Sequence, residues 1–224
     1  MGKEAGVDSQ RPAEMIKRVY LFDIDGTLVN AGGVGSQAFR DTVRNLLGHD
    51  LAWQGRDFAG QTDAGLFRRA LSEANRGDEL LLPLFEDYHQ RLELNLRARP
   101  PELLPGVEPL LARLAADPAN RVALLTGNTR RGSELKLPRL FPLFGFGIFG
   151  ESHVERSDLG VEARRYADAV FGPGTALTVI GDTPNDITCA RAAGAEAVAV
   201  ATGHFSPADL THADRVLSDL THWF

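Results

Sequence analysis

The chain has 224 residues, a formal net charge of −6 and a sequence pI near 5.5. This length allows one large domain or two small ones, and the acidic balance argues against nucleic acid as a main partner, since nucleic acid favours a basic surface. A single cysteine excludes an internal disulfide, and the longest apolar runs fall short of the roughly 18 residues of a membrane span, so we expect a cytoplasmic protein without a membrane partner.

Residues 1–17 are polar, lack the apolar centre of a signal peptide and are expected to form a flexible tail. The stretch Val19–Asn30 reads VYLFDIDGTLVN, and its apolar run is long enough for a strand but not for a helix. Side chains alternate along a strand, so Asp23 and Asp25 should point the same way while Ile24 points into the core. Two carboxylates at the carboxyl end of a buried strand suit a cation and a nucleophile.

Residues 32–100 read as helical, without a convincing strand. Apolar stripes predict three helices, over residues 36–47, from an N-cap at 62 or 63, and over residues 79–96. The glycine-rich stretch 31–35 is not followed by the GK[ST] of a phosphate-binding loop, which favours a flexible connector over a phosphate cradle. Consecutive prolines at 100 and 101 end the helical stretch. We therefore predict a separate helical module, residues 32–100, inserted after the first strand.

From residue 101 onward, apolar strands alternate with helices. Predicted strands cover residues 122–125, 146–149, 177–180 and 197–201; predicted helices cover 107–116, a segment after 128, 158–170 and 186–193. This alternation predicts an α/β protein with a mainly parallel sheet in a Rossmann-like, three-layer core, built from residues 18–31 and 101–224. In such sheets ligands bind beyond the carboxyl ends of the strands, so the polar residues at those ends are the candidates for a site.

Two such strand ends are informative. Thr126, Gly127 and Asn128 offer a hydroxyl and free N–H groups that suit an anion, although the same residue types favour an ordinary helix N-cap. Asp182 and Asp186 follow a later strand and are the hard oxygen ligands that Mg²⁺ prefers, although Asp186 alone could simply be a favourable charge at a helix start.

These segments resemble the motifs of the haloacid dehalogenase (HAD) superfamily. Asp23-Ile24-Asp25-Gly26-Thr27 is similar to its first motif, Thr126 matches the Ser or Thr of its second, and Gly181-Asp182 with Asp186 resembles its fourth, GDxxxD. A helical insert directly after the first motif is typical of the helical-cap subclass, and the branch it resembles is that of phosphoglycolate-phosphatase-like hydrolases. The resemblance covers about residues 18–224.

The third motif departs from the family pattern, in which a lysine precedes the helix before the fourth motif. That region of this chain has no lysine, and Arg156 is the candidate replacement, since its fork suits phosphate. Two other residues compete with it. Lys136 lies in the helix after the second motif and is expected to face solvent, and His153 is expected to lie in a loop without a site role.

The resemblance implies a Mg²⁺ cofactor and two working aspartates. Asp23 would attack phosphorus, and Asp25 would protonate the leaving oxygen and then activate water. The implied metal ligands are Asp23, Asp25 through its backbone carbonyl, Asp182 and Asp186. The implied phosphate-binding residues are Thr126, Gly127, Asn128 and Arg156. Four cap residues, Arg56, Gln61, Thr62 and Asp63, could equally face the site or form a helix-capping turn.

The leading hypothesis is a Mg²⁺-dependent phosphatase acting on a small phosphorylated metabolite, as a monomer or homodimer. Asp25 argues against a dehalogenase, which lacks an acid at this position, and the absence of lysine from residues 32–100 argues against phosphonate cleavage through a cap lysine. A sugar phosphomutase stays open. A phospho-accepting receiver domain and a catalytically silent relative are weaker alternatives.

Overall fold

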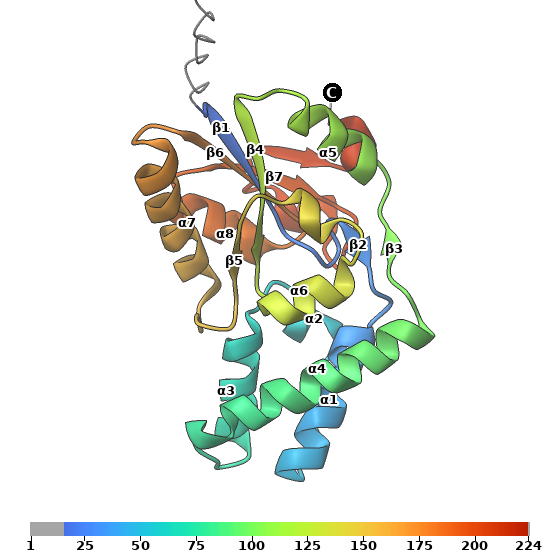
Figure 1. Cartoon of the computed structure of the whole chain (residues 1–224). Coiled ribbons are helices and arrows are strands. Elements are labelled where there is room, and N and C mark those ends of the chain that lie inside the picture. Colours follow the sequence, from blue (N-terminus) through green and yellow to red (C-terminus); the bar gives the residue numbers. More distant parts are fainter. Residues whose placement is uncertain (1–15, 224) are drawn as a thin grey trace, which may run out of the picture.

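The computed structural model describes residues 16–223, and its centre is one parallel sheet of six strands in the order β5-β4-β1-β6-β7-β8 (Figure 1). The strands are β1 (Arg18–Phe22), β4 (Asn120–Thr126), β5 (Gly147–Phe149), β6 (Ala176–Gly181), β7 (Glu196–Val200) and β8 (Arg215–Leu217). Counted along the chain within this sheet, the order is 3-2-1-4-5-6, the doubly wound arrangement in which the strand order reverses beside β1. The predicted α/β class is confirmed.

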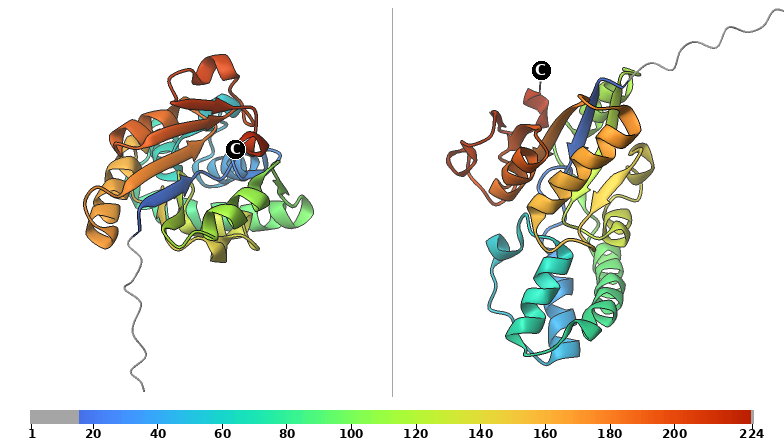
Figure 2. Two further views of the ribbon diagram at one scale, coloured as in Figure 1. Left: turned by 90° about the horizontal axis from the view of Figure 1, so that it is seen from above. Right: turned by 90° about the vertical axis from the view of Figure 1, so that its left-hand side faces the viewer.

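Helices cover both faces of this sheet, which gives three layers (Figure 2). On one face, α7 (Arg156–Phe171) and α8 (Pro184–Ala192) pack against strand residues such as Leu21; on the other, α5 (Val107–Ala115) packs against residues such as Phe22. Leu21 and Phe22 are adjacent in β1 and both almost fully buried, as the alternation of side chains on a doubly covered strand requires.

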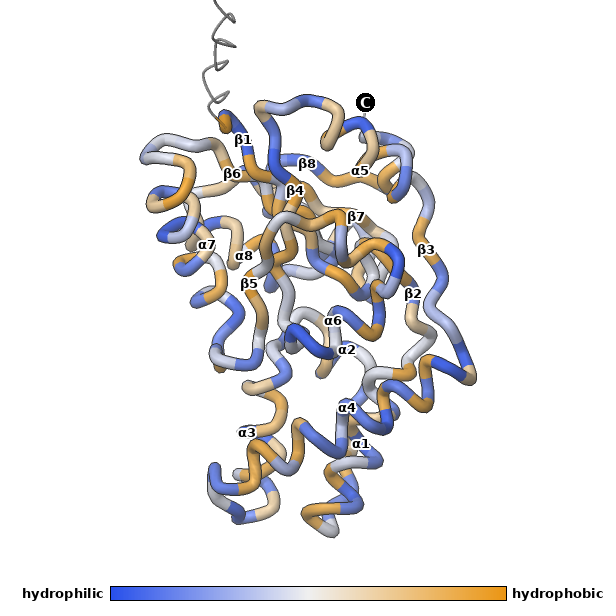
Figure 3. The backbone as a smooth tube through the Cα atoms, viewed as in Figure 1, coloured by the Kyte–Doolittle hydropathy of each residue, from blue (hydrophilic) through white to orange (hydrophobic). Residues whose placement is uncertain are grey.

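The insert forms a helical cap with its own apolar core. Its helices are α1 (Val34–Leu47), α2 (Gly55–Phe58), α3 (Asp63–Glu73) and α4 (Leu81–Ala98), with a short 3₁₀ turn at Asp78–Leu80. Phe39 lies at the centre of this core, stacked on Phe67 with ring centroids 4.3 Å apart. Figure 3 shows apolar stretches along the sheet strands and alternating apolar and polar segments along the cap helices.

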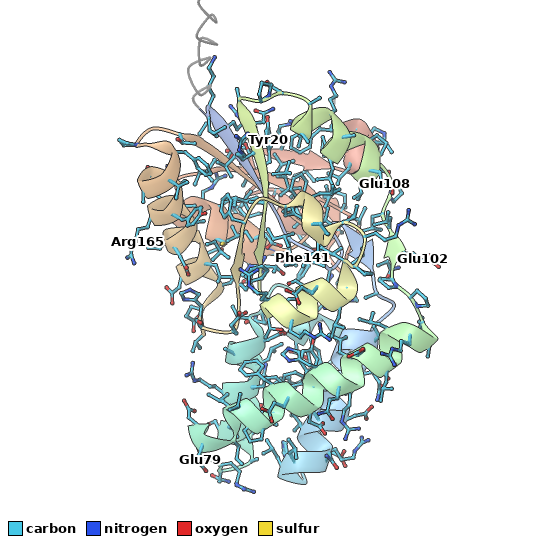
Figure 4. The ribbon with its side chains drawn as sticks, viewed as in Figure 1. Tyr20, Glu79, Glu102, Glu108, Phe141 and Arg165 are labelled. Atoms are coloured by element: carbon cyan, nitrogen blue, oxygen red, sulfur yellow. The ribbon has the colours of Figure 1, made fainter. Side chains whose placement is uncertain are left out.

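The two chain connections to the cap run side by side. A short antiparallel ribbon pairs β2 (Val29–Asn30), before the cap, with β3 (Glu102–Leu103), after it. The sequence did not indicate this ribbon, because two-residue strands carry no periodicity. The ribbon holds the two connections next to each other. The cap therefore forms one end of the molecule, and the core forms the other. In Figure 4, Glu79 marks the outer end of the cap, and Tyr20 lies in the opposite half.

Smaller differences from the expected elements have local causes. β8, which adds a sixth strand, was not predicted, because its three residues contain one outward-facing valine. Residues 1–15 of the expected tail lie outside the described part of the chain, whereas Ile16 packs into the core and Lys17 donates its N–H to the carbonyl of Ala119 (2.8 Å). The boundaries of the cap at residues 32 and 100 stay a prediction. Among residues 16–223, no helix has the length and apolar character to cross a membrane.

Candidate active site

Most of the candidate residues lie in or directly beside one cavity at the carboxyl end of the sheet. Asp23 follows β1, Thr126 ends β4 and Asp182 follows β6, and these three strands are direct neighbours. The cavity has a volume of about 310 Å³ and is lined from two sides, by strand-end residues such as Asp23 and by cap residues such as Tyr88. The switch in strand order beside β1 thus places the site where doubly wound sheets bind ligands.

Asp23 and Asp25 both line this cavity, whereas Ile24 between them is fully buried in the core. Burial raises the pKa of Asp23 to about 6, and the positive charge of Arg156 opposes that rise. The Asp23 Oδ1 atom has an ion-pair distance of 3.0 Å to Arg156 but no hydrogen bond of good geometry within the described residues. A buried carboxylate oxygen without a hydrogen-bond donor is well suited to bind a cation.

Three buried carboxylates converge beside Asp23. One oxygen each of Asp23, Asp182 and Asp186 lies within 4.8 Å of the others. Burial, followed by the charges of the neighbouring carboxylates, raises the pKa of Asp182 well above its usual range. Asp186 is engaged on both oxygens, because Oδ1 contacts Arg156 and Oδ2 accepts hydrogen bonds from the N–H (3.0 Å) and hydroxyl (2.7 Å) of Thr183. The donor set fits Mg²⁺, with Asp23 and Asp182 the freer ligands.

Two glycines make the close packing around Asp182 possible. A Cβ on Gly26, which has φ +77°, would lie 2.4 Å from the Asp182 Oδ2 atom, and a Cβ on Gly203 would lie 1.7 Å from it. Any larger residue would collide with the carboxylate. The Asp-Gly turn after β1 is therefore set by both backbone conformation and space.

Residues 126–128 form a compact polar turn. The Thr126 hydroxyl oxygen accepts hydrogen bonds from the Asn128 backbone N–H (3.3 Å) and side-chain amide (2.9 Å), so its own hydrogen stays available for another acceptor. Gly127 and Asn128 line the cavity, whereas Thr126 lies just behind them, fully buried. The Asn128 amide also donates to the Asp25 Oδ2 atom (2.9 Å), which ties this turn to the first strand's aspartates.

Arg156 is buried at the start of α7, with 6% of its side chain exposed. Its guanidinium bridges Asp23 and Asp186 and donates to the backbone carbonyl of Leu125 (3.2 Å). Arg156 is therefore not a surface arginine. It lies beside Asp23, and its expected role of holding the charges of the nucleophile and the phosphate together stays a prediction.

The expectation that Lys136 faces solvent was wrong. Lys136 is only 4% exposed, and its Nζ atom lies 2.5 Å from the Asp25 Oδ2 atom and 2.6 Å from the Asn128 Oδ1 atom. It ends α6 (Arg130–Lys136), whose exposed side carries Arg130 and Arg131 instead. The small residues Gly132 and Ser133, one helical turn earlier, are buried on the same side, and this was the signal in the sequence that Lys136 points inward.

Of the four cap residues that could either face the site or form a helix-capping turn, some do the first and some the second. Thr62 caps α3, since its hydroxyl oxygen accepts from the Gly65 N–H (3.0 Å), whereas Gln61 and Asp63 line the cavity. Arg56 does not line it; its guanidinium donates to the His204 carbonyl (3.1 Å). Asp63 accepts from the Thr129 N–H (2.8 Å), so it also joins cap to core.

Several cavity residues were not predicted to belong to the site. Tyr88, His204 and the glycine-rich stretch, including Gly33 and Gly35, line the cavity, although none belongs to a motif. Gly33 has φ +79° and is the N-cap of α1, so the predicted connector is a turn that starts a helix. His153 lies in a loop, as expected, and contacts Glu162. Cys189 is fully buried in the apolar core.

Comparison with known proteins agrees with this geometry. The family model of haloacid dehalogenase-like hydrolases matches residues 17–194. The protein CbbY of Rhodobacter capsulatus is 26% identical over 215 residues, which cover 91% of this chain and 94% of that protein.

Solved structures support the same fold. CbbY from Rhodobacter sphaeroides, in complex with phosphate, superposes with a TM-score of 0.73 at 20% identity, covering 93% of this chain and 96% of that one. A mutant of the same protein was solved in complex with xylulose-(1,5)bisphosphate. A predicted phosphoglycolate phosphatase from Haemophilus somnus has a TM-score of 0.66 at 21% identity, covering 92% of this chain and 95% of that one. Because the family model spans most of the sequence, the chain belongs to the haloacid dehalogenase-like hydrolases.

Proposed function

We propose that this protein is a Mg²⁺-dependent phosphatase that hydrolyses a small phosphomonoester through an aspartyl-phosphate on Asp23. One observation carries the proposal: Asp23 and Asp25 line the same cap-covered cavity as Asp182 and Arg156. That set combines a nucleophile, an acid/base, a metal ligand and a phosphate-binding cation within one site.

The charge balance of the cavity supports the need for a metal. Four aspartates line it, Asp23, Asp25, Asp63 and Asp182, against two cationic side chains, Lys136 and Arg156. A phosphate monoester would be repelled by this excess of negative charge. Asp23 and Asp182, with the backbone carbonyl of Asp25, would hold Mg²⁺, and Asp186 would act mainly by holding Arg156. When bound, the ion supplies charge neutralisation and Lewis-acid polarisation of the phosphoryl group.

The chain's own residues would then carry out two displacements. An oxygen of Asp23 attacks phosphorus, the bond from phosphorus to the ester oxygen breaks, and Asp25 gives its proton to the departing alcohol. In the second step Asp25 takes a proton from water, the water oxygen attacks phosphorus, and the bond to Asp23 breaks to release phosphate. The Thr126 hydroxyl, the N–H groups of Gly127 and Asn128, and Arg156 would stabilise the charge on the transferring group.

The substrate proposed is a small phosphorylated metabolite. A cavity of about 310 Å³ lies at the small end of the range for ligand sites, and the cap contacts the core directly around it, for example through the hydrogen bond from the Asp63 N–H to the Gly127 carbonyl (2.8 Å). Sugar phosphates are candidates, since xylulose-(1,5)bisphosphate is bound by a protein of similar fold.

Phosphate release tests the proposal, measured for a panel of small phosphomonoesters with Mg²⁺ and with EDTA, on wild type and on Asp23→Asn. Metal-dependent release that the variant lacks would support it. A sugar phosphate that is isomerised through a bisphosphate, without net phosphate release, would instead identify a phosphomutase. Absence of both activities across the panel would contradict the enzyme assignment of this site.

A further inference from the structure

We propose that Lys136, Tyr88 and the first turn of α1 form a seat for a second anionic group of the substrate. The substrate would then be a short phosphomonoester whose alcohol part bears a carboxylate or a second phosphate close to the ester oxygen. This inference rests on the proposed phosphatase function and assigns residues outside the sequence motifs to substrate selection.

Lys136 has one bonding direction left for a ligand. An ammonium group has three N–H donors, and two of them point at the Asp25 Oδ2 atom (2.5 Å) and the Asn128 Oδ1 atom (2.6 Å). Lys136 lines the cavity although its side chain is 96% buried, so its remaining donor is available to a ligand and not to bulk water. Buried charges are strong recognition elements, because little solvent screens them.

Tyr88 supplies an unpartnered hydroxyl. The residue is 2% exposed and lines the cavity, yet its Oη atom makes no hydrogen bond with any residue of the described range 16–223. Because this unpaired hydroxyl belongs to a residue that lines the cavity, a ligand bound there can form a hydrogen bond with it. Its ring is fixed by the cap core, where it makes edge contacts with Phe67 (centroids 5.7 Å apart) and Phe39 (6.3 Å).

The start of α1 completes the seat. This helix has 14 residues, no acidic residue in its first turn and no side-chain cap, and within the described chain the N–H groups of Gly35 and Ser36 have no hydrogen-bond partner. Free N–H groups at the positive end of a helix dipole favour an anion. A Cβ on Gly35 would lie 3.4 Å from the Lys136 Nζ atom and 3.8 Å from the Tyr88 Oη atom, so all three groups border the same small space.

The position of this seat limits the substrate. Lys136 touches Asp25, which would protonate the ester oxygen, so an anion bound by Lys136 lies only a few bonds from that oxygen. A long sugar with a distant second phosphate would place its charge elsewhere. The structure therefore favours a two- or three-carbon alcohol part over a large one.

Three esters with the same two-carbon chain test this: phosphoglycolate, ethylene glycol bisphosphate and hydroxyethyl phosphate. They end in a carboxylate, a phosphate and a neutral hydroxyl. We expect kcat/KM to be at least about 10-fold higher for one of the anionic esters than for the neutral one, since a hydrogen bond to a charged group contributes roughly 1.5–3 kcal/mol, about 10- to 150-fold. The anionic ester with the higher kcat/KM shows whether the seat binds a carboxylate or a phosphate.

Three variants probe the seat, and the quantity compared is the anionic-to-neutral ratio of kcat/KM. Lys136→Met should lower this ratio by about 10-fold or more, and Tyr88→Phe, which removes only a hydroxyl, by several-fold. Gly35→Ala leaves both side chains in place but fills the space between them, so it should lower the ratio while helix stability stays the same or rises. Lys17→Met and Tyr166→Phe, outside the cavity, are the matched controls.

Two results would overturn the inference. The first is a wild-type ratio near one. The second is an equal loss for all three esters in Lys136→Met together with unchanged ratios in Tyr88→Phe and Gly35→Ala, which would mean that Lys136 only positions Asp25.

A binding measurement separates this inference from the proposed function. If no ester is hydrolysed, the phosphatase proposal fails, and the seat is tested by calorimetry with phosphonopropionate and hydroxypropylphosphonate, stable analogues of the anionic and neutral esters. Tighter binding of phosphonopropionate, weakened in Lys136→Met, would uphold the seat. Equal affinities for both analogues would exclude it.

Discussion

The cavity has two walls that differ in origin. The core wall consists of residues at the ends of neighbouring parallel strands, where the backbone alone brings Asp23, Thr126 and Asp182 together. The cap wall consists of single side chains from separate helices, such as Asp63 on α3 and Tyr88 on α4, positioned by packing. From this difference we infer a division of labour, in which the sheet would hold the reacting groups and the cap would supply substrate selection and closure.

The two buried cations illustrate this division. Arg156 lies wholly within the core wall, between Asp23 and Asp186, and would serve every substrate in the same way. Lys136 also belongs to the core, but it borders Gly35 and Tyr88 of the cap and would sense the part of the substrate that varies. If the comparison is right, changes to the core wall other than at Lys136 should affect all substrates equally, and changes to Lys136 or to the cap wall should affect some substrates more than others.

The largest effect is expected for Asp23→Asn. An amide cannot replace the attacking carboxylate, so kcat should fall by a factor of about 10⁴ or more for every ester. The substitution is nearly isosteric and removes one buried negative charge, so the protein should stay folded. Circular dichroism and melting temperature serve as controls for the kinetic assay. Residual activity within 10-fold of wild type would show that Asp23 is not the nucleophile.

Arg156→Met should have the next largest effect and should act on stability as well as activity. It leaves buried Asp23 and Asp186 without their shared cation, and breaking a buried ion pair costs roughly 3–5 kcal/mol. Arg156→Lys keeps the charge but not the fork, so it should recover most of the stability and only part of kcat. Urea denaturation and kinetics on both variants test this. Equal stability of Arg156→Met and wild type in metal-free buffer would contradict it.

The core wall was predictable from the sequence because strands have a period of two and parallel strands end at the same edge. Those two rules predict that Asp23, Asp25 and Asp182 lie together at the carboxyl edge of the sheet. The position of Lys136 was not predicted, because the small residues Gly132 and Ser133 on the same side of α6 are the only sign in the sequence of its buried face, and seven residues are too few for a clear apolar stripe.

The cap wall was less predictable, because its residues reach the cavity only through the packing of separate helices. Tyr88 reads as one of several apolar residues in a helical stripe, and its ring does pack in the cap core. Only the packed structure shows that its residue lines the cavity and that its hydroxyl has no hydrogen-bond partner among residues 16–223. Contacts between residues far apart in the chain depend on how cap and core pack, which no local pattern encodes.

A smaller effect is expected where the cap presses on the core. A Cβ on Gly65, within α3, would lie 2.5 Å from the backbone carbonyl oxygen of Val154, so Gly65→Ala should displace the cap slightly. Overpacking of this size costs roughly 1–3 kcal/mol, and we expect kcat/KM to fall about 10-fold or more. Gly145→Ala, with no neighbouring atom within 4 Å of its Cβ, is the control. Unchanged kcat/KM in Gly65→Ala would mean that this contact does not set cap closure.

The smallest and most specific effect concerns Asp63, at the contact between cap and core. Burial raises its pKa to about 6, against the opposing effects of Lys136 and the Thr129 N–H. The folded protein therefore holds this proton more tightly than the unfolded chain, whose pKa is near 3.8. The contribution of Asp63 to the free energy of unfolding is therefore fully present below about pH 4 and is lost as the pH rises through 6. The total loss is up to about 3 kcal/mol.

Asp63→Asn removes this loss while its side-chain carbonyl can still accept from the Thr129 N–H. The variant should therefore be more stable than wild type at pH 7.5, by up to about 2–3 kcal/mol, and the difference should shrink toward pH 4. Urea denaturation at both pH values, in EDTA, gives the comparison, with Glu86→Gln as an exposed carboxylate control on the same cap. A difference that does not change with pH would mean that Asp63 is not the titrating group. The expected result would show that packing the cap on the core buries the carboxylate of Asp63 at a cost in stability. Protonation of Asp63 would then favour the closed position of the cap.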